Sequence, residues 1–164
     1  MLVVVRGPAS SPVILTRSRI DLVDASLPNQ PYHAIVKDGL SLHDGGALVA
    51  RVRQSATSAA TAATKSAVKE FGVTGVGVVA RIRNLPDDLE RILSSHALLH
   101  AAEGALFEQA VLDAATGVGL ACSVAEPNST HIGHALDAAG KALGPPWQKD
   151  HKLAATAAML ALER

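Results

Sequence analysis

The chain has 164 residues, a length that suits one domain over 1–164, and 48% of them are hydrophobic, which allows a sizeable core. Its 15 basic and 15 acidic residues cancel, which excludes the strongly basic composition typical of nucleic-acid-binding proteins, so nucleic acid would need a local basic patch. The lone Cys122 excludes an internal disulfide and indicates a reducing cytoplasm, and no stretch has the pattern of a membrane span or a signal peptide.

The first half of the chain carries strand patterns and one long helix pattern. Three short runs rich in β-branched residues predict strands, at 2–6, 13–15 and 20–23. Two prolines, an asparagine and a glycine predict a loop over 25–43. The Ala/Thr/Ser-rich stretch 44–72 predicts a long helix that begins at Asp44 and ends at Gly72.

The second half alternates between buried strands and helices. The stretch 73–83 is almost continuously apolar through Ala80, as buried parallel strands are, and 119–126 is a second strand of this buried type. Four helices are expected: a short one near Pro86, a long one from Ser94 or Ser95 to about Ala115, one capped by Ser129 or Thr130, and a last one at about 148–163. This order predicts an α/β fold with a mixed five-stranded sheet, in which three antiparallel N-terminal strands precede helical crossovers and helices cover both faces.

The order of elements resembles the ribonuclease H-like superfamily, in its RuvC-type branch. The segment "AAEGALFEQAVLDAATGVGLACSVAEP" (101–127) is similar to a helix-then-strand unit of that branch. The segment "PPWQKDHKLAATAAMLAL" (145–162) is similar to its final helix, which brings an acidic residue to the active site. The chain also resembles a family of uncharacterised actinobacterial proteins. The first resemblance implies a divalent-metal-dependent nuclease or resolvase-like enzyme that acts on nucleic acid with Mg²⁺ or Mn²⁺.

The set of acidic residues expected at such a nuclease site is incomplete in this chain. Family members that cut nucleic acid carry an Asp in the first strand and an acid at the end of the fourth, where this chain has Arg6 and Ala80-Arg81. The resemblance leaves three candidates for catalysis: Glu103, Asp150 and His151. A non-catalytic interaction or ligand-binding module on the same fold is the alternative, favoured by the missing Asp and the zero net charge.

Two histidines and a glutamate repeat at the spacing of a helical turn. His96, His100 and Glu103 fall within about 60° of one another on a helix, at the edge of the face that carries Leu99 and Leu106. Two histidines at i and i+4 with a third ligand can hold Zn²⁺. A polar pocket, or a purely structural hydrogen bond between His100 and Glu103, fits the same pattern.

Basic side chains and one aromatic residue are candidates for binding. Arg81 and Arg83 point the same way on a strand end, and with Arg6 they would form a positive cluster at one sheet edge, suited to phosphate or carboxylate. Solvated strand ends are the alternative. Trp147 and Lys149 follow a Pro-Pro turn, which either presents the ring to bases and phosphates or wedges it into the core.

The scarcity of aromatic residues is relevant to whether the chain forms oligomers. Only 2% of the chain is aromatic, so the core is built from Ala, Val, Leu and Ile. Part of such a small-residue surface suits a subunit interface, so we expect a homo-oligomer.

Overall fold

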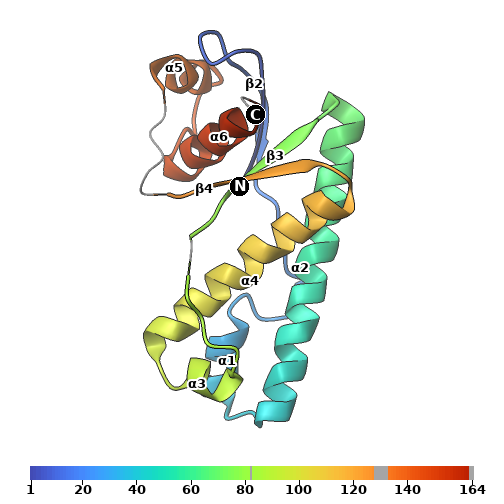
Figure 1. The fold of residues 1–164 in the computed structure, drawn as a ribbon, viewed down its shortest axis with the longest axis vertical. Helices are drawn as coiled ribbons and strands as arrows, with labels where there is room; N and C mark the ends of the chain where they lie inside the picture. Colours follow the sequence, from blue (N-terminus) through green and yellow to red (C-terminus); the bar gives the residue numbers. More distant parts are fainter. Residues whose placement is uncertain (82, 128–132, 163–164) are drawn as a thin grey trace.

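The computed structural model describes residues 1–81, 83–127 and 133–162 (Figure 1). This part of the chain contains ten elements: β1 (Leu2–Arg6), β2 (Val13–Ser18), α1 (Pro31–Asp38), α2 (Leu42–Phe71), β3 (Gly75–Val79), α3 (Leu89–Leu93), α4 (His96–Gly117), β4 (Ala121–Ala125), α5 (His134–Ala142) and α6 (Lys149–Leu162). The long helices α2 and α4 cross each other, α1 and α3 lie at one end of the molecule, and the strands lie at the other end with α5 and α6 (Figure 1).

The strands form two separate sheets. β1 pairs with β2 in antiparallel fashion, with an irregularity between Val4 and Val5, and β3 pairs with β4 in parallel, with Gly75 opposite Ala121. The parallel pair and its helical connection through α3 and α4 confirm the prediction for the later strands. The predicted five-stranded mixed sheet is wrong, because each described sheet has two strands and the two are not hydrogen-bonded to each other.

The predicted third strand at 20–23 is also wrong. Leu22 and Val23 pack against the core between the helices instead of extending β2. The hydroxyl of Ser55 on α2 accepts a hydrogen bond from the backbone N–H of Asp24 at 3.0 Å and lies 3.5 Å from the backbone oxygen of Leu22. Backbone groups that could pair with a neighbouring strand therefore contact the Ser55 hydroxyl on α2 instead.

The observed helix ends agree in part with those predicted from the sequence. Gly72 ends α2 in the left-handed region (φ 66°), as predicted, but the N-cap is Ser41, whose hydroxyl accepts from the backbone N–H of Asp44. α4 begins after Ser95, as predicted. The expected cap at Ser129 or Thr130 lies outside the described residues.

The expected loop at 25–43 contains a helix. α1 starts with Pro31 in its first turn and ends at Gly39, which is left-handed (φ 63°). Proline fits the first turn of a helix and glycine fits its end, so the two loop signals mark the boundaries of α1. Tyr32 and Ile35 bury this helix against α2 and α4.

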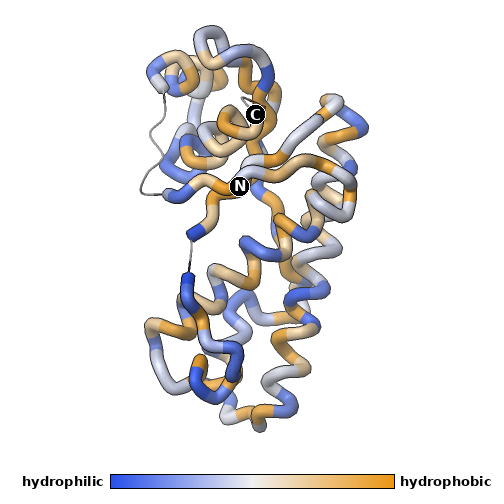
Figure 2. The backbone as a smooth tube through the Cα atoms, viewed as in Figure 1, coloured by the Kyte–Doolittle hydropathy of each residue, from blue (hydrophilic) through white to orange (hydrophobic). Residues whose placement is uncertain are grey.

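Two hydrophobic clusters hold the fold together. The first lies among α1, α2, α3 and α4 and contains Tyr32, Ile35, Val49, Val52, Ala56, Ile92, Leu99, Ala102, Leu106 and Ala110. The second lies among β1, β2, α5 and α6 and contains Val3, Val5, Ile14, Leu136, Ala155 and Met159. The buried residues of α2 and α4 recur mostly every three or four positions, so each helix has one buried face, and Figure 2 shows polar positions between the apolar ones along α2. No helix in the described ranges has both the length and the apolarity needed to cross a bilayer.

Helix α6 connects the two sheets, because it packs on β1, β3 and β4. Its approach to β3 is closest at Gly77, where an added Cβ atom would overlap the carbonyl carbon and oxygen of Ala157. At Gly75, two residues earlier on the same strand, an added Cβ would meet its nearest atom, the oxygen of Ala121, at an ordinary 3.5 Å. The absence of a side chain at Gly77 therefore sets the distance between α6 and β3.

We expect Gly77→Ala to lower the free energy of unfolding by at least about 2 kcal/mol, because neither backbone can yield locally. Gly75→Ala is the matched control and should change it by less than about 1 kcal/mol. Urea unfolding followed by circular dichroism measures both. Equal stability of the two variants would contradict the close approach of α6 to β3.

Helix α5 is fastened to α6 by Asp137. Its carboxylate accepts from Lys141 Nζ at 2.7 Å, from Trp147 Nε1 at 2.8 Å and from Lys152 Nζ at 3.0 Å. These donors, Lys141 foremost and then Trp147 and Lys152, hold the pKa of Asp137 well below its ordinary value. The Trp147 ring also covers Gly140, where a Cβ atom would overlap the indole.

A lowered folded-state pKa means that the ionised Asp137 contributes stability above its unfolded pKa of about 3.9, and that this contribution falls as pH drops further. We therefore expect Asp137→Asn to be less stable than the unmodified chain at pH 7 and pH 5, with the difference shrinking below about pH 4. Thermal unfolding at each pH measures this difference. A constant gap between the two proteins down to pH 2 would contradict the role of the charge.

Candidate metal centre

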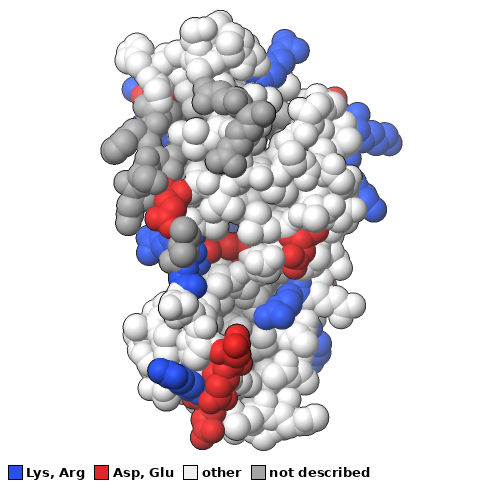
Figure 3. Space-filling model, viewed as in Figure 1, with Lys and Arg blue, Asp and Glu red and all other residues white. Residues whose placement is uncertain are grey.

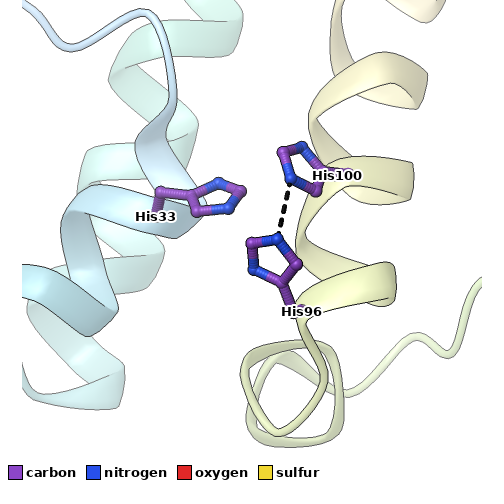
Figure 4. A group of neighbouring side chains, drawn as sticks. All are labelled: His33, His96 and His100. Carbon is purple, nitrogen blue, oxygen red and sulfur yellow. Dashed lines mark hydrogen bonds between the residues drawn. The ribbon is translucent and has the colours of Figure 1, made fainter.

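Three histidines from two helices converge on one point (Figure 4). His33 comes from α1, and His96 and His100 come from the first two turns of α4. Each ring offers one nitrogen, and the three nitrogens lie within 4.8 Å of one another. Within the described ranges, no other group of three or more His, Cys, Asp or Glu residues meets this criterion.

Local structure explains why the rings meet. His96 and His100 are four residues apart, so they lie on the same face of α4. In α1, the buried Tyr32 and Ile35 fix the face that packs inward, which leaves the intervening His33 half-buried and directed toward α4 (Figure 4). The site therefore depends on the docking of α1 against α4.

Glu103 supports the cluster from behind. Its side chain is buried, and its Oε1 atom accepts from His33 Nδ1 at 2.9 Å and from the His33 backbone N–H at 3.3 Å. An imidazole that donates through Nδ1 keeps its lone pair on Nε2, the other ring nitrogen. Carboxylates often hold metal-binding histidines in this way, which fixes the ring and increases the basicity of the ligating nitrogen.

The spacing of two of the three nitrogens is close to that around a tetrahedral ion. The Nε2 atoms of His96 and His100 are 3.1 Å apart, which is a hydrogen bond from one ring to the other. Around Zn²⁺, Zn–N bonds of 2.0–2.1 Å in a tetrahedron separate neighbouring nitrogens by about 3.3 Å. The planes of His96 and His100 are inclined by 86°, those of His33 and His96 by 87° and those of His33 and His100 by 52°, so no two of the rings stack in parallel.

The centre is open to solvent. His96 and His100 are exposed, and the His33 side chain retains 25% of its accessible surface. In the described part of the chain, no fourth His, Cys, Asp or Glu joins the cluster. An ion bound here would have three protein ligands and a free coordination position.

The metal ligands suggested by the sequence were His96, His100 and Glu103. The structure brings the two histidines together, but Glu103 binds His33 and does not stand among the converging nitrogens. Sequence reasoning missed His33 because its segment was assigned to a loop. Pro31 and Gly39, eight residues apart, were the available signal for a short helix.

The arginine candidates lie apart from this centre. Arg83 forms a bidentate ion pair with Glu108 on α4, in which its Nη2 atom donates to Glu108 Oε1 at 2.9 Å. The guanidinium group lies over Gly104 of the same helix. The backbone N–H of Arg81 donates to the same carboxylate. Arg6 is exposed at the end of β1. β3 ends at Val79, so Arg81 and Arg83 lie beyond this strand, and β1 and β3 belong to different sheets.

The residues around the start of α6 have mainly structural contacts. Trp147 is half-buried against α5, and its ring lies 5.9 Å from that of His151. His151 is buried, and its Nδ1 accepts from the backbone N–H of Gln148 at 3.2 Å. Lys149 and Asp150 are exposed in the first turn of α6. Asp150 and Glu103 belong to no common cluster of metal-ligand side chains in the described residues.

Neither the surface charge nor the comparison with known proteins identifies a further functional site. On the face drawn in Figure 3, the described acidic and basic side chains are intermixed, without an extended positive surface. Comparison of the chain with protein-family models, curated proteins and solved structures finds no match.

The hydroxyl of Tyr32, the residue next to His33, has a raised pKa. Burial raises its pKa above the ordinary value of 10.0, the nearby Arg53 opposes this through its charge and a hydrogen bond, and Glu103 raises the pKa slightly further. The phenol is therefore held neutral behind the cluster. A raised pKa contributes stability below the unfolded value of about 10 that is lost as pH rises through the folded value.

The chain has one tyrosine, so its ionisation can be followed directly by ultraviolet absorbance. We expect Tyr32 to titrate above pH 10 in the folded protein and near 10 in urea, and Arg53→Met to raise the folded value further because the opposing cation is gone. Tyr32→Phe removes the signal and serves as the control. An unchanged titration in Arg53→Met would contradict the interaction with Arg53.

Proposed function

We propose that this protein binds one divalent transition-metal ion, of the class of Zn²⁺, through His33, His96 and His100. The observation that carries the proposal is the convergence of three imidazole nitrogens from two helices far apart in the sequence. The buried carboxylate of Glu103 behind His33 supports it, because that arrangement orients a histidine for a metal.

The chemistry of the donors selects the ion. Imidazole nitrogen suits Zn²⁺, Cu²⁺, Ni²⁺ and Fe²⁺, whereas Mg²⁺ and Mn²⁺ prefer carboxylate, carbonyl and water oxygens. Three histidines therefore favour an ion different from the Mg²⁺ or Mn²⁺ that a nuclease would need.

Three ligands and an exposed position favour an ion that can exchange a fourth ligand. Structural zinc sites are usually closed by four protein ligands, whereas sites that bind water or substrate keep one position free. The exposure of His96 and His100 leaves such a position accessible to water or a small anion.

The nuclease function implied by the ribonuclease H-like resemblance stays a prediction. Two-ion cleavage of phosphodiesters needs several carboxylate oxygens close together. Glu103 is engaged by His33, and Asp150 lies on a separate helix at the exposed start of α6. We therefore favour the three-histidine centre.

The test is metal binding by the full chain produced without a histidine tag. Isothermal titration with Zn²⁺ should give one ion per chain, and Co²⁺ should give the visible bands of tetrahedral coordination. We expect His33→Ala and His100→Ala to weaken Zn²⁺ binding by about 100-fold or more, and Glu103→Gln by about 10- to 100-fold, because it only supports His33.

His43→Ala is the matched control, since His43 is exposed and lies outside the cluster, and it should bind Zn²⁺ like the unmodified chain. Circular dichroism of each variant checks that the helices remain. Equal affinity of His33→Ala and His43→Ala, or no Zn²⁺ binding by the unmodified chain, would overturn the proposal.

A further inference from the structure

A hollow of about 300 Å³ lies between the two hydrophobic clusters. It is lined by β1, β3, the C-terminal half of α2 and α6, together with parts of the segment after β2. Val3 and Val5 on its wall belong to the cluster around α6, whereas Leu22 packs against the cluster around α4. None of the three histidines lines it, so the hollow is separate from the metal centre.

The wall is apolar. Large side chains that are only half-buried face it, among them Leu15, Ile20, Phe71 and Val76. One buried polar side chain, Thr64, also lines it, but its hydroxyl donates to the backbone oxygen of Ala60 at 2.8 Å. The wall therefore favours a hydrocarbon group over a polar one.

The described residues that line the hollow include one charged side chain. Arg6 is the single lining residue with a charged side chain, and it is exposed, so it lies at the rim. Within the described part of the chain, Arg6 has no ion-pair partner. A guanidinium group presents paired N–H donors that match the two oxygens of a carboxylate.

We propose that this hollow binds a straight-chain carboxylate of medium length, with the hydrocarbon tail in the hollow and the carboxylate on Arg6. At about 30 Å³ for each water-sized group, the hollow holds about ten such groups, which corresponds to a chain near decanoate. The apolar wall selects the tail, and the isolated cation at the rim selects the anionic head.

The first arm of the test measures chain length. Isothermal titration of the full chain with hexanoate, octanoate and decanoate should show affinity rising about fourfold for each added CH₂ group. Dodecanoate should gain little more, because its tail exceeds the hollow. Absence of saturable binding by decanoate would overturn the proposal.

The second arm uses a matched pair on α2. Ala63 lines the hollow, whereas the neighbouring Ala62 is exposed and does not. Ala63→Leu should fill part of the space and weaken decanoate binding by about tenfold or more, whereas Ala62→Leu should leave it unchanged. Thermal unfolding shows that both variants remain folded, and equal binding by the two would overturn the location.

The third arm identifies the head group. Arg6→Met keeps an apolar stem and removes the charge, so decanoate should bind it no more tightly than 1-decanol binds the unmodified chain. Binding of 1-decanol itself should not change. If decanoate and 1-decanol bind the unmodified chain equally, or if Arg6→Met has no effect, the ligand is not selected as a carboxylate and the proposal fails.

Discussion

The crossing of α2 and α4 is the contact on which the other features depend. Small buried residues, including Ala56 on α2 and Ala102 and Ala110 on α4, allow the two backbones to approach closely. This pair forms the wall on which α1 docks, which brings His33 to the first turns of α4. The same pair continues toward the strands, where the C-terminal half of α2 forms one side of the apolar hollow. Both proposed binding sites are therefore attached to the same pair of packed helices.

Local patterns predicted the elements better than their assembly. Gly72 and Ser95 marked helix ends because caps act within one turn, and the apolar stretches around β3 and β4 indicated a parallel pair. The number of strands in a sheet depends on which backbone edges meet in space, which periodicity does not encode. The run at 20–23 has the composition of a strand, but its hydrogen bonds and apolar side chains are used on α2. Tertiary packing overrode β-propensity at that point.

At the candidate site, too, the sequence predicted the geometry within one helix better than the contacts between helices. The i, i+4 spacing of His96 and His100 predicted that two rings share a face, because the helix alone determines that geometry. His33 could not be foreseen in the same way, since its position depends on how α1 packs on α4. The sequence places Glu103 at the edge of the buried face, whereas in the structure its side chain is buried and its partner comes from another helix. A residue's neighbours across an interface are set by the fold as a whole.

Residues 81 and 83–88 are attached to α4 partly by charged groups. This connection between β3 and α3 is tied to the helix by the ion pair of Arg83 with Glu108, and Gly104 leaves room for the guanidinium to cross. A contact ion pair whose side chains retain 18% and 22% of their accessible surface is screened by salt less than an exposed pair, and apolar packing is not weakened by salt. Salt therefore weakens the hold of this connection on α4 only in part, because Leu85 of the same connection also packs on the first hydrophobic cluster.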